Sequence, residues 1–147
     1  MWLRSSLVAL ACLAATSAAA DMAISDVKLH TGIGKRPSVA YARLENRNAA
    51  PDALIKVESP AFKRIELHTY KHAQDGMMRM RRIKRIALPA GEAVKLRSGG
   101  HHLMLFGFRG ETGSPVALTF TFADSPPQTI NVVPSSRRKK SGHHDHH

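Results

Sequence analysis

Apolar and polar residues alternate in several short runs of this chain, which is the pattern of half-buried β-strands. The same period of two appears in residues 38–45, 62–68 and 116–122, and again at 130–132. The clearest run places four apolar residues on one face: Val116, Leu118, Phe120 and Phe122. Residues 103–108 are apolar on both faces, which is typical of a central strand covered by a second layer. The pattern therefore predicts a β-protein.

Turn residues separate these runs at intervals typical of a β-sandwich. Proline or glycine occurs at Pro37, Pro51, Pro60, Pro89 to Gly91, Gly99 to Gly100 and Pro126 to Pro127. The chain shows no internal repeat and almost nothing with a helical period. We expect an all-β fold, a single antiparallel sandwich, over residues 21–134.

The first twenty residues have the features of an export signal. Arg4 precedes a short apolar stretch, and small residues lead up to a cleavage position between Ala20 and Asp21. The apolar stretch is far below the ~20 residues that span a bilayer, and no later segment is longer. Lipidation at Cys12 is the alternative, but it leaves an apolar stretch of only residues 7–11, with Ala9 where leucine is usual. We expect residues 1–20 to be removed and the protein to be exported without a lipid anchor.

Composition narrows the classes of function. The chain is 43% hydrophobic and 22% charged, as in ordinary globular proteins. Its one cysteine, Cys12, lies in the predicted signal. The mature protein therefore has no disulfide framework, no thiolate zinc site and no cysteine nucleophile.

The chain is strongly basic, with a formal net charge of +11 that falls to +10 when the signal and its Arg4 are removed. Basic residues cluster at 79–85 and at 137–140. Nucleic acid is one partner for such charge, but the export signal argues against it. Anionic lipid head-groups or an acidic protein fit an exported protein better, and a solvated surface with no partner is the plain alternative.

Histidine and methionine concentrate between residues 68 and 104. The residues are His68, His72, His101, His102, Met77, Met78, Met80 and Met104. On extended strands His102 and Met104 share a face, as do Met78 and Met80. One histidine, one methionine and a His-x-Met pair from three strands could converge into a four-ligand site. Imidazole with thioether suits a soft monovalent ion, which indicates Cu(I). Core methionines with ordinary surface histidines are the alternative reading.

The spacing of these residues resembles a known family. His68 is followed by eleven residues, Met80, twenty-one residues and His102-Leu103-Met104. With the segments at 66–68, 76–81, 88–91 and 99–105, this is similar to the periplasmic copper chaperones of the PCu(A)C type. The resemblance covers essentially the whole predicted domain. One departure is Thr69, where the motif often has methionine, and another is the polar stretch 70–72.

The resemblance implies a cupredoxin-like, Greek-key sandwich in the periplasm. It also implies Cu(I) bound by four residues, which are His68, Met80, His102 and Met104. Met78 and His72 are candidate auxiliary ligands. The implied partners are copper acceptors, namely a cytochrome c oxidase subunit and Sco-type proteins.

Residues 135–147 form a basic tail that ends in a cluster of histidines: His143, His144, His146 and His147. The tail lacks large apolar side chains, so we expect it to be disordered. Imidazole clusters favour Cu(II), which makes the tail a candidate accessory Cu(II) site.

The residues as a whole favour a copper metallochaperone without enzymatic activity. No Ser-His-Asp set, carboxylate pair or phosphate-binding loop is recognisable in the sequence. Two alternatives remain: a redox or electron-transfer protein that turns over at the copper, and a basic adhesion or structural module that binds anionic surfaces.

Overall fold

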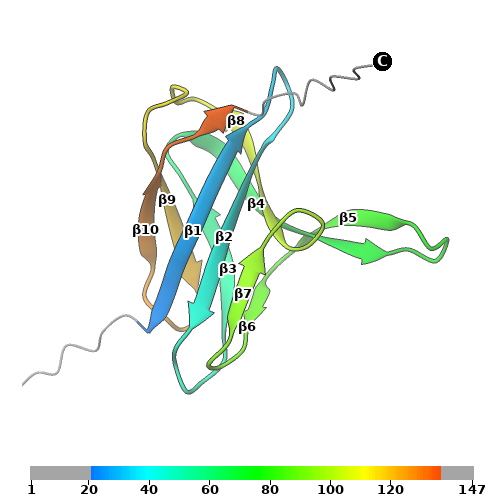
Figure 1. Ribbon diagram of the computed structural model, residues 1–147, viewed down its shortest axis with the longest axis vertical. Coiled ribbons are helices and arrows are strands. Elements are labelled where there is room, and N and C mark those ends of the chain that lie inside the picture. Colours follow the sequence, from blue (N-terminus) through cyan, green and yellow to red (C-terminus); the bar gives the residue numbers. More distant parts are fainter. Residues whose placement is uncertain (1–20, 137–147) are drawn as a thin grey trace, which may run out of the picture.

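The computed structural model describes residues 21–136, and every regular element in this range is a β-strand (Figure 1). In chain order the strands are β1 (Met22–Thr31), β2 (Ser38–Asn46), β3 (Asp52–Glu58), β4 (Phe62–His72), β5 (Met78–Ile83), β6 (Ile86–Leu88), β7 (Ala93–Leu96), β8 (His102–Phe108), β9 (Val116–Phe122), β10 (Gln128–Val132) and β11 (Ser135–Ser136). A search of this part of the chain finds no helix with the length and apolar character needed to cross a membrane.

The strands form two sheets that make a sandwich. The larger sheet has the order β11-β1-β2-β8-β4-β5, with β7 also paired to β2. The smaller sheet has the order β10-β9-β3-β6. Every pairing is antiparallel except the short one between β1 and β11. The predicted all-β sandwich is confirmed, with that one parallel pair as a difference.

The hydrophobic core lies between the two sheets, where the alternating residues of each strand meet. In β9 the buried positions are those predicted, and Leu118 and Phe120 are completely buried. From the larger sheet β8 contributes Leu103 and Leu105. Burial of each such side chain stabilises the fold by about 1.5–3 kcal/mol. The prediction that residues 103–108 form a central strand is also confirmed, because β8 lies between β2 and β4.

Strand β4 is longer than its apolar pattern indicated. The sequence predicted a strand ending at His68, but β4 continues to His72 and pairs with β5 throughout its second half. The hydropathy pattern could not show this, because residues 69–72 do not face the core and are held as a strand by their pairing with β5. Residues 69–82, which we call the arm, project from the body of the sandwich as a hairpin (Figure 1).

Both ends of the described chain add to the larger sheet. Strand β1 escaped the sequence analysis because a bulge between Ser25 and Lys28 interrupts its alternation, with Asp26 at a φ of 51°. Ser135 and Ser136 were assigned to the tail, but they pair with β1 as β11. The Ser135 Oγ lies 2.9 Å from the His30 Nδ1. The predicted signal at 1–20 and the rest of the predicted tail lie outside the described residues.

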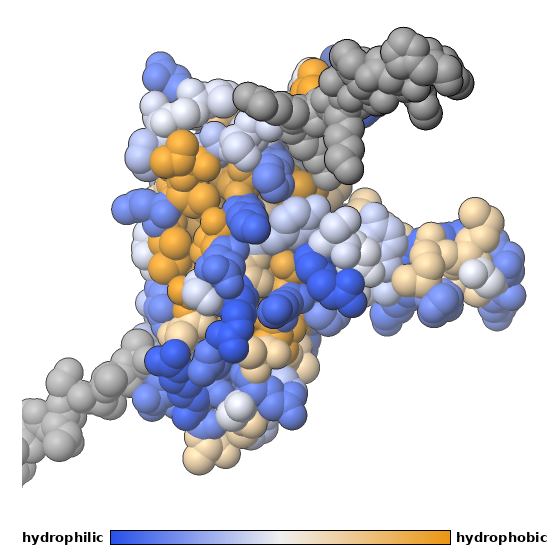
Figure 2. Space-filling model, viewed as in Figure 1, coloured by the Kyte–Doolittle hydropathy of each residue, from blue (hydrophilic) through white to orange (hydrophobic). Residues whose placement is uncertain are grey.

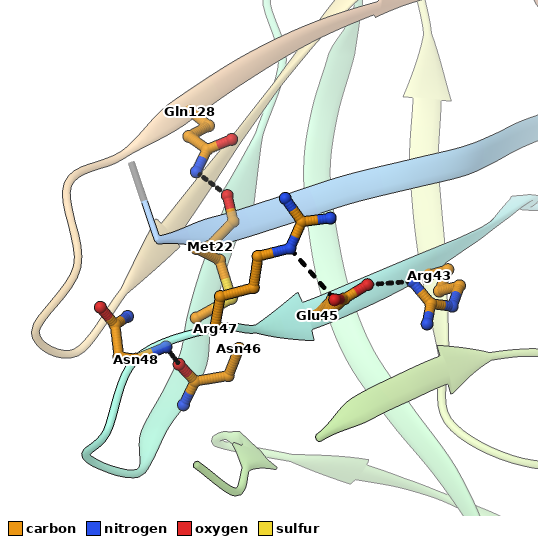
Figure 3. Close-up of polar contacts among 7 residues, drawn as sticks. All are labelled: Met22, Arg43, Glu45, Asn46, Arg47, Asn48 and Gln128. Atoms are coloured by element: carbon orange, nitrogen blue, oxygen red, sulfur yellow. Dashed lines mark hydrogen bonds and ion pairs between the residues drawn. The ribbon is translucent and has the colours of Figure 1, made fainter. Parts of the chain in front are cut away.

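Polar contacts hold the C-terminal end of β2, where the chain turns toward β3 (Figure 3). Asn46 is completely buried, and its side-chain amide donates to the Leu88 carbonyl at 2.8 Å. Its Oδ1 accepts from the Asn48 backbone N–H at 3.0 Å. Glu45 next to it accepts from Arg47. A buried amide destabilises the fold unless it is hydrogen-bonded, so these contacts favour a single arrangement of the chain at this end of the sandwich.

Candidate metal centre

Three neighbouring strands bring the predicted copper ligands to one face of the larger sheet. β4 supplies His68, β5 supplies Met80, and β8 supplies His102 and Met104. The register places His68 directly opposite His102, and Tyr70 opposite Met80. Side chains directly opposite each other on an antiparallel pair point to the same face. The predicted convergence of ligands from three strands is therefore what the backbone pairing produces.

A pocket of about 260 Å³ opens at this place. Its lining includes Met80, His102 and Met104, with Tyr70 beside them. The other lining residues come from three segments and are Arg36, Pro37, Val39, Tyr41, Ser98 and Gly99. His68 does not line the pocket, but the centroid of its ring is 5.8 Å from that of His102. Three predicted ligands share one pocket, and the fourth lies next to it.

His102 presents a bare ring nitrogen to the sulfur of Met80. Its Nδ1 lies 3.0 Å from the Gly100 carbonyl oxygen, which only accepts, so Nδ1 carries the hydrogen. Burial lowers the pKa of His102; the hydrogen bond to Gly100 opposes this, and the nearby His68 lowers the pKa further. The ring is therefore neutral at pH 7, and Nε2 holds a lone pair 3.2 Å from the Met80 Sδ. Two electron-pair donors at this distance are placed to share a soft cation.

His68 is oriented through its other nitrogen. Its Nε2 lies 2.9 Å from Oε2 of Glu66. Hydrogen bonds from His68 and Arg64 hold the pKa of Glu66 below its usual value, despite some burial. The ionised carboxylate accepts only, so Nε2 of His68 donates to it. The Nδ1 of His68 is then buried without a hydrogen-bond partner. A carboxylate that fixes the tautomer of a histidine is a common second partner of metal ligands.

The two methionines differ in exposure. Met104 is 9% exposed and Met80 is 40% exposed. The pocket is thus lined by one buried and one solvent-exposed thioether side chain. Among residues 21–136 no group of three or more His, Cys, Asp or Glu side chains is arranged to hold a metal ion. A metal held here would thus depend on thioether sulfur, which suits a soft monovalent ion and not zinc, magnesium or calcium.

Two neighbours of the site escaped the sequence analysis as functional residues. Glu66 precedes His68 by two positions on the same strand, and that spacing is the signal that could have identified it. The Tyr70 ring lies with its centroid 5.5 Å from that of His102. No signal in the sequence marks this contact, because it depends on the pairing of β4 with β8.

The remaining candidate ligands do not line the pocket. His72 and Met78 lie directly opposite each other farther out on the arm. His101 precedes the paired part of β8, and burial lowers the pKa of this histidine. The tail histidines, which are His143, His144, His146 and His147, lie outside the described residues.

Comparison with known proteins identifies the family. The family described as "Putative lipoprotein LpqE-like" matches residues 14–134, which is most of the chain. The chain belongs to the LpqE-like family. The "Putative lipoprotein Lxx21020" of Leifsonia xyli subsp. xyli is 26% identical over 102 residues. That alignment covers 67% of this LpqE-like chain and only 61% of the length of the relative.

Solved structures share the fold of this LpqE-like protein. The copper-bound PCuAC domain from PmoF2 matches with a TM-score of 0.65 and 23% identity, over 79% of this chain and 93% of that domain. Apo-DR1885 from Deinococcus radiodurans matches with a TM-score of 0.58 and 22% identity, over 92% and 93% of the two chains. The resemblance to PCu(A)C-type proteins inferred from the sequence is confirmed.

The family corrects one expectation about the N-terminus. The short apolar stretch before Cys12 argued against lipidation, yet both the matched family and the relative from Leifsonia carry the description "Putative lipoprotein". The shortness of the apolar stretch before Cys12 is therefore no sufficient reason to exclude a lipid anchor. Cys12 itself lies outside the described residues.

Proposed function

We propose that this LpqE-like protein is an extracytoplasmic copper metallochaperone that binds Cu(I) through His68, Met80, His102 and Met104. The observation that carries the proposal is the contact between the bare Nε2 of His102 and the Met80 sulfur at 3.2 Å. A fold shared with a copper-bound PCuAC domain supports the choice of metal. In this proposal copper is cargo, and the protein binds and releases it without catalysis.

The donor set supports delivery as well as binding. Neutral thioether and imidazole stabilise Cu(I), but an acceptor that offers thiolates binds it more strongly. Copper would pass from this site to such an acceptor without any change in oxidation state. We propose copper centres such as those of cytochrome c oxidase as the destination, with a Sco-type protein as a second acceptor, and the periplasm as the compartment.

The charge around the site favours an acidic acceptor surface. Arg36 lines the pocket, and Arg82 lies opposite His68 on the face of the sheet that carries the proposed ligands. Complementary charge steers association and raises its rate. The same surface could contact anionic lipid, which would hold the protein near membrane-bound acceptors.

The test is an anaerobic Cu(I) titration of the protein against a competing chelator. We expect Met80→Ala and His102→Ala each to weaken Cu(I) binding by at least ~10-fold, about 1.4 kcal/mol, because each removes one ligand. The matched control is Met77→Ala, which removes a methionine that is 63% exposed and does not line the pocket. This control should bind Cu(I) as tightly as the parent protein.

Two results would contradict the proposal. If both ligand variants keep the parent affinity, the site is misassigned. If the copper-loaded protein instead cycles between Cu(I) and Cu(II) while it reduces oxygen, the redox protein is the better description.

A further inference from the structure

The arm carries a second histidine–methionine pair beyond the pocket. His72 and Met78 lie directly opposite each other, one pleat farther out than the pair of Tyr70 and Met80. Residues two apart on a strand point to the same face, so Met78 shares the face of Met80 and His72 shares that of His68. From the pocket toward the tip of the arm, this face carries Met80 and then Met78 on β5, with Tyr70 and then His72 beside them on β4.

The opposite face of the arm has a different chemistry. There Lys71 lies opposite Arg79, and Thr69 lies opposite Arg81. Alternation along β5 thus gives the outer part of the arm a sulfur-bearing face with Met78 and Met80 and a cationic face with Arg79 and Arg81. At the base of the arm, Arg82 lies on the sulfur-bearing face, opposite His68. Figure 2 shows the two kinds of side chain next to each other on the projecting arm.

The exposed methionines of the arm contribute little to the core. Seven large hydrophobic residues are exposed in the described part of the chain, and four of them belong to the arm and its turn: Tyr70, Met77, Met78 and Met80. None of these four belongs to the core or packs against it. Met78 is 47% exposed on a strand that already pairs through its backbone. Fold stability therefore gives no reason for sulfur at this position, whereas binding of a soft ion does.

We infer that His72 and Met78 form an outer Cu(I) station, through which copper reaches and leaves the pocket. The inference rests on the proposed function, because it assigns the path to the same inner site. Met78 and Met80 are about 7 Å apart along the strand. A copper ion can thus move from the outer to the inner pair by exchanging ligands one at a time.

The number of donors gives this path a direction. The outer pair offers two ligands in an exposed hairpin, and the inner site offers two methionines and two histidines around a pocket. The outer station therefore binds Cu(I) more weakly and fills after the inner site. At the outer pair, an acceptor can approach the copper without entering the pocket.

The test follows each methionine methyl group of the full-length protein by ¹³C NMR during anaerobic addition of Cu(I). We expect the first equivalent to shift the methyl groups of Met80 and Met104, and a later equivalent to shift that of Met78. His72→Gln should abolish the later shift of Met78. The tail histidines carry no sulfur, so copper bound there does not shift a methionine methyl group.

A kinetic measurement tests the path itself. The double variant His72→Gln/Met78→Ile should take up Cu(I) from a small chelate about tenfold more slowly, equivalent to about 1.4 kcal/mol of barrier. Its inner-site affinity should stay within about twofold of the parent value. The control is Lys71→Gln, which changes the cationic face of the same hairpin and should load at the parent rate.

Each outcome separates the inference from the proposed function. If Met78 never shifts, or if the double variant loads as fast as the parent, the outer station is wrong while the inner site stands. If Met80 and Met104 do not respond to the first equivalent, the proposed function itself fails. If His72→Gln leaves the Met78 shift intact, the pairing of these two residues is wrong.

Discussion

His68 and His102 lie opposite each other on adjacent strands, yet the protein orients them through different nitrogens. The Gly100 carbonyl accepts a hydrogen bond from Nδ1–H of His102, and the Glu66 carboxylate accepts one from Nε2–H of His68. Each ring is left with one nitrogen free of any protein hydrogen-bond donor. This arrangement orients two uncharged nitrogen donors, which fits the proposed binding and release of a monovalent ion.

Glu66 is the residue on which the orientation of His68 depends. We predict that Glu66→Gln lowers the Cu(I) affinity by about tenfold, because loss of a partner that orients a metal-binding histidine typically costs 10–100-fold. The amide can still accept a hydrogen bond, but it no longer fixes the tautomer through its charge. A competition titration with a Cu(I) chelator measures the effect.

The control for this variant is Glu58→Gln. Glu58 is exposed and pairs with Lys56 on β3, away from the copper pocket. An unchanged affinity in Glu66→Gln would mean that His68 reaches its position without help from the carboxylate.

At the scale of elements, β4 performs two tasks along its length. Its first half contributes Phe62 and Leu67 to the core, and its second half leaves the body as one strand of the arm. His68 lies where the two halves meet, and at 8% exposure it is well covered. The site therefore combines a fixed side on β8 with a side on β5 that is held mainly by strand pairing.

Strand β3 is fixed at its start by a buried carboxylate, and this predicts a pH dependence of stability. Burial raises the pKa of Asp52, but hydrogen bonds from the Ser125 hydroxyl and from the backbone N–H groups of Ala53, Asp124 and Ser125 outweigh it. The pKa is thus lowered in the folded state. The stabilisation is fully present above the unfolded value of about 3.9 and is lost as the pH falls through the folded value.

We therefore expect Asp52→Asn to lower the free energy of unfolding at pH 7 and to lose less of it than the parent protein on acidification. Chemical denaturation at several pH values between about 6 and 3 measures this difference. The control is Asp124→Asn, which changes an exposed side chain next to Ser125 and keeps the backbone N–H that donates to Asp52. Parallel acid profiles of the parent and Asp52→Asn would contradict the prediction.

At the scale of the whole molecule, the candidate copper pocket lies at the root of a hairpin that projects from the sandwich (Figure 1). The core fixes β8 and the first half of β4, so in the proposed function His68, His102 and Met104 would keep their positions when copper leaves. The arm gives a partner access to sulfur without opening the core. In the proposed function, the body of the larger sheet would bind copper and its projecting hairpin would pass it on.

The tail gives a prediction that concerns the full chain. Deleting residues 141–147 should remove a Cu(II)-binding event near neutral pH and leave Cu(I) binding at the pocket unchanged. Imidazole binds metal only when it is neutral, and its ordinary pKa is about 6.5. Lowering the pH from about 7.5 to about 5.5 should therefore release copper from the tail before copper leaves the thioether-containing site.

Stoichiometry by anaerobic and aerobic titration of the full and shortened chains checks this prediction. A shortened protein that keeps its full Cu(II) stoichiometry would move Cu(II) binding to the pocket histidines. A tail site that outlasts the pocket in acid would mean that the two share ligands.

The sequence by itself determined the fold class, because alternation of apolar residues directly reports which strand faces are buried. It also supplied the candidate copper ligands, since the spacing of His68, Met80, His102 and Met104 is visible along the chain. The sequence could not show that β8, β4 and β5 are neighbours or that β4 continues beyond His68. It also could not show the contacts that Glu66 and Tyr70 make with the two histidines. These depend on which strands pair and in what register, and the pairing is set by contacts between residues far apart in the chain. Only the tertiary structure decided that a bare nitrogen of His102 faces the sulfur of Met80, because that contact joins two strands whose separate patterns carry no record of each other.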